Sequence, residues 1–197
     1  FPGTPGAPHC ADNHLGMTLR PGHLLAALAA LLIAAPAAGA AEQACPASHA
    51  TPATASKREI VNATLCALNR ERAHHGLKAL RLNRKLSTAA RRHARDMARR
   101  NYFSHDTLGG GSFVDRIRRT GYLRSVSRWT VGENLAWGSG DRATPEAIMQ
   151  AWMESPGHRH NILTRGFREI GIGVIFGAPT QVGLPAATYA TDFGARQ

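Results

Sequence analysis

The chain has 197 residues, of which 43% are hydrophobic and 19% are charged. This length suits one domain with a targeting segment and is short for two domains that each bury a full core. The composition excludes a chain that is disordered throughout. The formal net charge is +11, from 24 Lys and Arg against 13 Asp and Glu, so the surface is expected to attract anionic partners.

The N-terminal region has the three parts of a secretory signal. Arg20 gives a positive start, an apolar run extends from Leu24 to Ala35, and small residues precede a cleavage point that we place after Ala40. The apolar run is about a dozen residues long, whereas a membrane-spanning helix needs roughly 20. The pattern favours a signal peptide over 17–40, and hence a secreted protein that is extracellular or periplasmic, rather than a retained anchor.

Two segments on either side of this signal carry no pattern of a fold. Residues 1–16 precede Met17, are rich in Pro and Gly, and are interpreted as an overextended start that is disordered. Residues 41–55 are rich in Ala, Pro, Thr and Ser, and this composition buries too little surface to offset its ordering entropy. We therefore predict a linker over 41–55 and a folded domain over 56–197.

The signal peptide bears on the expected partners. An exported basic protein meets anionic cell-wall polymers and lipid headgroups before it meets nucleic acid. We expect a monomer whose partner is a lipid or an anionic cell-wall polymer, with contact to a membrane surface left open and no nucleic acid. The alternative is a solvated arginine-rich face that reflects biased codon usage and has no dedicated partner. The arginines gather on two predicted helices. They are Arg91, Arg92, Arg95, Arg99 and Arg100 on one helix and Arg116, Arg118 and Arg119 on the next.

Cleavage after Ala40 leaves two cysteines, Cys45 and Cys66. Export to an oxidising compartment predicts a disulfide between them. A metal-binding or catalytic role is disfavoured, because neither cysteine lies in a C-x-x-C pair or beside a residue that could act as a base.

Helix signals occupy the first part of the domain. Ser56 and Glu59 form a capping box that begins a helix ending at Gly76, and Asn83 caps a second helix that runs through Asn101. Ser112 and Asp115 begin a short third helix that ends near Gly121. A fourth begins at Thr144-Pro145 and ends at Ser155-Pro156-Gly157.

After Phe167 the pattern changes to short strand-like runs. These cover 170–176 and 187–193, and a third candidate lies around 128–136. Because helices come first and strands last, the order favours an α+β fold with an antiparallel sheet covered by helices over a doubly wound parallel fold.

Three segments place ionisable groups beside glycine and aromatic residues. They are Tyr102–Asp106, Gly132–Gly138 and Ala151–Leu163. Together, in this order, they resemble the CAP superfamily of cysteine-rich secretory, antigen 5 and pathogenesis-related proteins, in its bacterial secreted SCP-like branch. The resemblance also includes 68–72, 121–122, 171–174 and 189–193, and it covers roughly 57–195.

The resemblance implies an α-β-α sandwich with a large open cleft. The two histidines of the family's cleft fall on His105 and His158, and its first glutamate falls on Glu133. The family's second glutamate would fall on Ser155, and Glu154 lies one position earlier, about 100° around a helix, which puts its role in doubt. His160 is an additional histidine that we interpret as a surface residue or as one that supports the cleft from behind.

Two imidazoles in one cleft bind Zn²⁺ or another divalent metal with open positions for water. No third ligand is evident from the pattern, so we expect a weak and exchangeable site formed by His105 and His158 with Glu133. If a metal-bound water formed, Glu133 is the candidate general base. The alternative is that these three residues form a polar hydrogen-bond network that ties loops together over the sheet.

Three classes of function follow from these observations. The first is a non-enzymatic secreted module that binds a lipid, a cell-wall component or a protein partner. The second is a metal-dependent, peptidase-like hydrolase, although the chain has no H-E-x-x-H motif that would support it independently. The third is a structural or stress-related envelope protein with a vestigial cleft.

Overall fold

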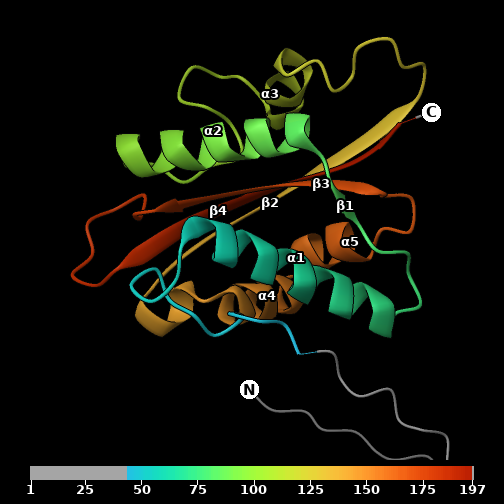
Figure 1. Cartoon of the computed structure of the whole chain (residues 1–197). Coiled ribbons are helices and arrows are strands. Elements are labelled where there is room, and N and C mark those ends of the chain that lie inside the picture. The colour runs from blue at the N-terminus through green and yellow to red at the C-terminus, as the bar shows by residue number, and fades with distance from the viewer. Residues whose placement is uncertain (1–43, 197) are drawn as a thin grey trace, which may run out of the picture. The chain divides into compact units, whose positions relative to one another are not determined.

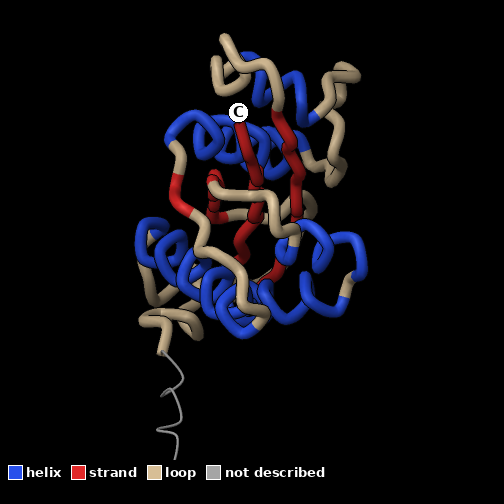
Figure 2. The backbone as a smooth tube through the Cα atoms, turned by 90° about the vertical axis from the view of Figure 1, so that its right-hand side faces the viewer, coloured by secondary structure: helices blue, strands red, loops and turns tan. Residues whose placement is uncertain are grey.

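The fold has three layers, with a sheet enclosed between two layers of helices (Figure 1). A computed structural model describes residues 44–196. The predicted signal peptide and the residues that precede it therefore lie outside the described residues. Figure 2, seen from the side, shows the strands edge-on between the two helical layers. The predicted α+β sandwich is confirmed.

The central sheet has the order β1-β3-β4-β2. Its strands are β1 (Arg81–Leu82), β2 (Trp129–Ser139), β3 (Glu169–Phe176) and β4 (Ala186–Arg196). Strand β4 pairs antiparallel with both β2 and β3, whereas the two-residue β1 pairs in parallel with β3. The three predicted strands are confirmed, and β2 forms one edge of the sheet.

The helices begin at the caps that the sequence predicts. They are α1 (Lys57–His74), α2 (Arg84–Arg100), α3 (Phe113–Arg119), α4 (Pro145–Glu154) and α5 (Pro156–Leu163), with a 3₁₀ turn η1 (Gly140–Ala143). Side chains of Ser56, Asn83, Ser112 and Thr144 all accept a backbone N–H at their helix starts. Helix α5 was not predicted, because the proline that ends α4 also occupies the first position of a new helix, where its missing N–H is tolerated.

Helices α1, α4 and α5 cover one face of the sheet and α2 with α3 covers the other (Figure 1). Trp152 of α4 is fully buried on the first face and donates from Nε1 to the carbonyl of Leu135 in β2 at 3.0 Å. On the second face, α2 packs its apolar stripe directly on β3. A Cβ atom added at Gly171 or Gly173 would lie less than 3.0 Å from backbone atoms of α2, so the two elements touch backbone to backbone.

A buried arginine fastens α1 to the segment that connects α5 and β3. Arg72 is fully buried, and its guanidinium donates to the carbonyls of Lys78, Ile162 and Thr164 at 2.9, 2.6 and 3.1 Å. A charged donor that satisfies several buried carbonyls fixes their relative positions. The end of α5 is thereby held in place.

Residues 44–55 are not a free linker. They form hydrogen-bonded turns, and the carbonyl of Ser48 accepts the backbone N–H of Glu146 in α4 at 2.9 Å. The predicted disulfide between Cys45 and Cys66 is confirmed, and Cys45 is buried against the domain. The prediction of a linker from composition is wrong for these residues. They have few apolar side chains to bury, but the disulfide and the hydrogen bonds compensate for the entropy that is lost when they become ordered.

We expect the C45S/C66S variant to lose about 3 kcal/mol of unfolding free energy, because the disulfide closes a loop with a sequence separation of 21 residues. Denaturant unfolding of the wild-type and variant proteins measures this difference, and reduction of the wild type should reproduce it. Hydrogen exchange over 45–55 should also accelerate in the variant. A loss below about 0.5 kcal/mol, the range of a neutral surface change, would contradict the prediction.

Candidate functional site

The site is built on neighbouring residues of β2, the edge strand. Successive residues of a strand point to opposite faces of the sheet. Glu133 pairs in register with Asp192, which in turn lies opposite Gly171 beneath α2. Glu133 therefore projects toward the α2 and α3 layer, and Asn134 projects toward the α4 and α5 layer.

Both carboxylate oxygens of Glu133 are occupied. The side chain is 1% exposed, and Oε1 is 2.8 Å from Nδ1 of His105 while Oε2 accepts from Nη2 of Arg116 at 2.5 Å. Arg116 also donates from Nη1 to the carbonyl of His105 at 2.8 Å. Glu133 and Arg116 together fix both the backbone and the ring of His105, and they leave Nε2 of that ring as the atom free to meet a ligand.

The hydrogen bond that Glu133 accepts from the ring raises the pKa of His105, and burial opposes this shift in part. The ring is nevertheless half-exposed, at 53% of its side-chain surface. A proton on His105 is therefore retained to a higher pH than on an ordinary histidine, and a ligand for Nε2 must displace it.

Asn134 positions the second histidine from the opposite face. Its Nδ2 donates to the carbonyl of His158 at 3.0 Å, and its Oδ1 accepts from Nδ2 of Asn161 at 2.8 Å. Burial lowers the pKa of the half-buried His158, and the positive charge of His105 lowers it further. His158 thus lies within electrostatic range of His105.

A second carboxyl group lies beside Glu133. Asp192 is fully buried, and burial raises its pKa well above the usual range, with the negative charge of Glu133 as the next cause. None of the described residues supplies a donor to its oxygens. The raised pKa favours the protonated, uncharged form of Asp192 beside the Glu133 carboxylate.

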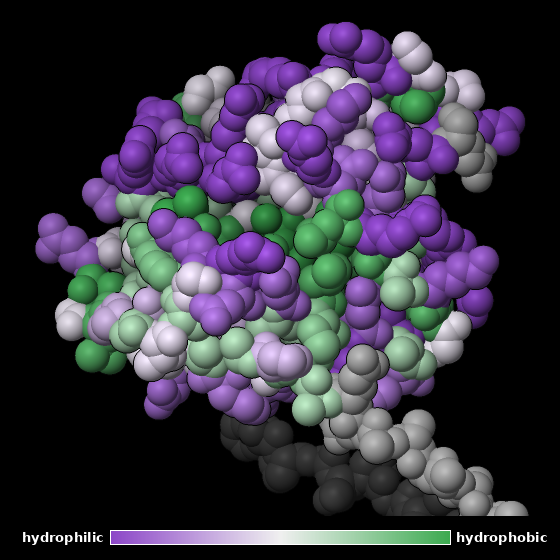
Figure 3. Space-filling view, in the orientation of Figure 1, coloured by the Kyte–Doolittle hydropathy of each residue, from purple (hydrophilic) through white to green (hydrophobic). Residues whose placement is uncertain are grey.

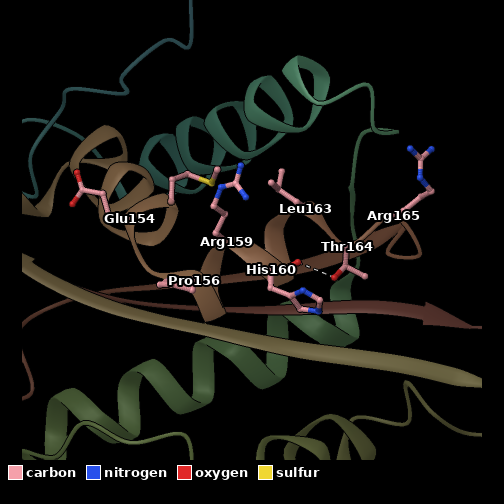
Figure 4. A pocket seen from close by; sticks show the side chains of 8 residues that line it. Glu154, Pro156, Arg159, His160, Leu163, Thr164 and Arg165 are labelled. Carbon is pink, nitrogen blue, oxygen red and sulfur yellow. Dashed lines mark hydrogen bonds between the residues drawn. The ribbon is translucent and has the colours of Figure 1, made fainter. Parts of the chain in front are cut away.

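The structure brings His105 and Glu133 into direct contact and His158 into electrostatic range of His105, but it places Glu154 and His160 elsewhere. These two residues line a cavity of about 740 Å³ beside α4 and α5 (Figure 4). The Oε1 atom of Glu154 accepts from Gln150 of its own helix at 2.9 Å. The doubt about Glu154 is thus resolved against a role beside Glu133.

Four residues of the site were not assigned to it from the sequence. They are Arg116, Asn134, Asn161 and Asp192. The sequence held a signal for Arg116 and for Asp192. A buried glutamate requires a cation nearby, which Arg116 supplies, and Asp192 interrupts a strand whose other residues are mostly apolar or carry hydroxyl groups. Residues 44–196 contain no group of three or more His, Cys, Asp or Glu side chains placed to hold a metal. Each Glu133 oxygen already has a partner, so the carboxylate that the sequence predicts as part of a metal site is engaged by His105 and Arg116.

The family profile described as "CAP: Cysteine-rich secretory protein family" matches residues 65–191, which is more than half of the chain. The chain belongs to the CAP family. The resemblance drawn from the three motif segments is therefore confirmed, and the edge-strand site lies within the matched region of the CAP domain.

Two relatives come from Bacillus subtilis (strain 168). The "Uncharacterized protein YkwD" is 39% identical over 122 residues, which are 62% of this chain and 43% of the relative. The "Uncharacterized membrane protein YlbC" is 33% identical over 121 residues, which are 61% of this chain and 32% of the relative. The chain spans less than half the length of these curated relatives.

Two solved structures share the fold. An extracellular protein containing an SCP domain from Bacillus anthracis str. Ames is 29% identical with a TM-score of 0.51, over 69% of this chain and 39% of that one. An outer surface protein from Borrelia burgdorferi is 20% identical with a TM-score of 0.59, over 73% of this chain and 97% of that one, and supports the fold alone. Within the described part of the CAP domain, no helix is long and apolar enough to cross a membrane.

Proposed function

We propose that this CAP domain is an extracellular binding module of the cell envelope, with a weak and exchangeable divalent-metal site at His105 and His158, and that it is not a hydrolase. A disulfide is typical of an oxidising compartment, and the similar protein from Bacillus anthracis is described as extracellular. The net charge of +11 favours anionic envelope components as partners.

The observation that carries the proposal is the engagement of both oxygens of Glu133. One accepts from His105 and the other from Arg116, and the side chain is almost completely buried. A general base must reach the water that it deprotonates. A carboxylate held in this way orients a histidine and does not activate water, which argues against the hydrolase alternative.

The same geometry suits a histidine ligand. A carboxylate that holds one ring nitrogen fixes the orientation of the imidazole and raises the basicity of the other nitrogen. The lowered pKa of His158 keeps the second ring neutral, as a ligand must be. Two neutral imidazoles suit Zn²⁺, Cu²⁺ or Ni²⁺, and two protein ligands give weaker binding than the four of a structural zinc site.

Calorimetric titration with zinc tests this site. We expect His105→Ala and His158→Ala each to weaken zinc binding by about tenfold or more, whereas His160→Ala, on the same helix as His158, should leave it unchanged. Affinity should begin to fall while the pH is still above about 6.5, the pKa of an ordinary histidine, because the pKa of His105 is raised and protonated imidazole does not bind metal. His105 should limit binding first, since its pKa is raised and that of His158 is lowered.

Two results would overturn the proposal in different ways. If both histidine variants keep the zinc affinity of the wild type but lose stability, the histidines and Glu133 serve as a hydrogen-bond network. If the protein turns over a peptide or cell-wall substrate, and if a chelator and His105→Ala both abolish this turnover, the hydrolase alternative is correct.

A further inference from the structure

A second cavity lies between α2, the segment that follows it and α3. Its volume is about 420 Å³, and it does not include His105, Glu133 or His158. Four arginines line it against a single carboxylate, that of Asp96. The arginines are Arg92 and Arg100 from α2 and Arg116 and Arg119 from α3. Figure 3 shows that hydrophilic residues cover most of the layer that contains α2 and α3.

The positive charge of this cavity is neutralised only in part by its neighbours, because Arg116 is paired with Glu133. Arg92 and Arg119 form no ion pair with any residue between 44 and 196, and Arg100 pairs only with Asp96, at 3.6 Å. The guanidinium of Arg119 lies against Gly111, at 3.4 Å from where a Cβ of that glycine would be. Absence of a side chain at Gly111 thus leaves room for Arg119 beside Thr107, another residue of the lining.

Two buried residues of the lining have polar atoms without a partner. His93 is 1% exposed and Arg116 is 7% exposed, and neither Nδ1 of the one nor Nε of the other has a hydrogen bond in the described part of the chain. Nε2 of His93 is 2.8 Å from the carbonyl of Ser104, which only accepts, so the proton of the neutral ring is on Nε2. Nδ1 therefore accepts from a hydroxyl when the ring is neutral and donates to an anion when it is charged.

A third cavity of about 510 Å³ shares Arg92 and Arg119 with the second and adds Arg84 and Lys85. Its described lining has no acidic residue. The two cavities thus form one basic groove along α2 and α3, with the shared arginines at the junction.

We propose that this groove binds a phosphodiester polymer that carries hydroxyl groups, with one phosphate in the cavity of Arg92, Arg100 and Arg119 and the next in the adjoining cavity. Guanidinium groups match the oxygens of phosphate in a bidentate manner. A cavity of this volume exceeds one phosphate and accommodates a polyol or sugar unit with it. Single-stranded nucleic acid is disfavoured, because the described lining has no aromatic ring besides the buried His93 on which bases could stack.

This inference rests on the proposed binding function and deepens it by naming a ligand class and a second site. The two can fail separately, because zinc binding depends on His105 and His158 and polymer binding depends on Arg92 and Arg119. If the wild type binds the polymer but not zinc, the metal site is wrong and the groove stands; if it binds zinc but not the polymer, the groove is wrong and the metal site stands.

The test is a titration of the purified protein with poly(glycerol phosphate). We expect Arg92→Ala/Arg119→Ala to weaken binding at least about tenfold, since charge-assisted hydrogen bonds to phosphate are lost. The matched control is Arg95→Ala/Arg99→Ala, which removes the same charge from exposed positions of α2 that line neither cavity. It should change affinity less than about threefold in moderate salt. The histidine signals of His93 should shift on addition of poly(glycerol phosphate) to the wild type and not to the R92A/R119A variant.

The remaining probes identify the source of any binding. Inorganic phosphate should bind more weakly than the polymer at the same site, because it occupies one cavity. Equal losses in the two double variants, or equal binding of polyglutamate, would overturn the proposal in favour of unspecific surface charge. Binding only to phosphatidylglycerol vesicles would assign the groove to a lipid surface, tighter binding of an oligonucleotide would assign it to nucleic acid, and no binding of any phosphate probe would refute it.

Discussion

Replacing Gly171 by alanine is expected to lower the free energy of unfolding by about 3 kcal/mol or more, because a rigid overlap is inserted between helix and sheet. The new Cβ atom would lie less than 3.0 Å from the carbonyl carbon of Leu86 and the amide nitrogen of Ser87. Both are backbone atoms inside α2, so no side-chain rotation relieves the contact. The helix must move away from β3, and its apolar stripe loses its packing along the whole strand.

Thermal and denaturant unfolding measure this effect, with Gly166→Ala as the matched control. Gly166 has no atom within 4 Å of its potential Cβ position, so the same substitution there should be nearly neutral. Gly171 also lies beside Asp192 in the register of β3 and β4. Solvent should therefore reach Asp192 in a Gly171→Ala variant that still folds. Equal unfolding midpoints for the two alanine variants would contradict the close approach of α2 and β3.

The predictable parts of the fold are those specified by local sequence. The capping box of Ser56 and Glu59 and the cap at Asn83 mark their helix starts within one residue of the observed ones. These signals are local hydrogen bonds, which a sequence displays directly. Strand β1 has only two residues and pairs with β3, a contact that no periodicity can reveal over so short a length. The order of residues 44–55 depends on a covalent partner in α1, which composition does not record.

The candidate site could likewise be predicted only in part. The family resemblance gave His105, Glu133 and His158, but not which groups would occupy the carboxylate of Glu133. Arg116 lies 17 residues before it in sequence and reaches it from another layer of the fold. Asp192 reaches it through strand register, which is determined by the sheet as a whole. The chemistry of Glu133, a positioning residue rather than a free base, thus depends on contacts that only the assembled fold creates.

Replacing Glu133 by glutamine is expected to lower the free energy of unfolding by about 3–5 kcal/mol, because it removes the negative partner of a buried arginine. Glu133 is the residue of the described chain that forms an ion pair with Arg116, at 2.5 Å, and both side chains are shielded from water. Glutamine has nearly the same volume, so the loss reports charge and hydrogen bonding rather than packing. Arg118→Gln, which breaks an exposed pair with Asp115 on the same helix, is the control and should cost less than about 1 kcal/mol.

The same variant should lower the pKa of His105, because the hydrogen bond that the Glu133 carboxylate accepts from the ring is the largest cause that raises it. A histidine with a raised pKa in the folded state contributes stability that is present below its unfolded pKa and lost as the pH rises through the folded value. This part of the difference between wild type and Glu133→Gln is therefore largest below about pH 6.5 and shrinks above it. Titration of the His105 ring by NMR measures the pKa directly, and an unchanged value would show that Glu133 does not position the ring.

The Asp192→Asn variant distinguishes the contribution of Asp192 to stability from that of Glu133. In the wild-type background we expect it to change stability little, because asparagine, like the protonated carboxyl group that the raised pKa favours, carries no charge beside Glu133. In the Glu133→Gln background the second cause of the raised pKa of Asp192 is gone, whereas the nearby charge of Arg116 still lowers that pKa. Asp192 then ionises more readily and replaces part of the missing negative charge. Asparagine should consequently cost about 1–3 kcal/mol more in that background than in the wild type. A double-mutant cycle that is additive within about 0.5 kcal/mol would mean that Asp192 and Glu133 are not coupled and that Arg116 is balanced by Glu133 alone.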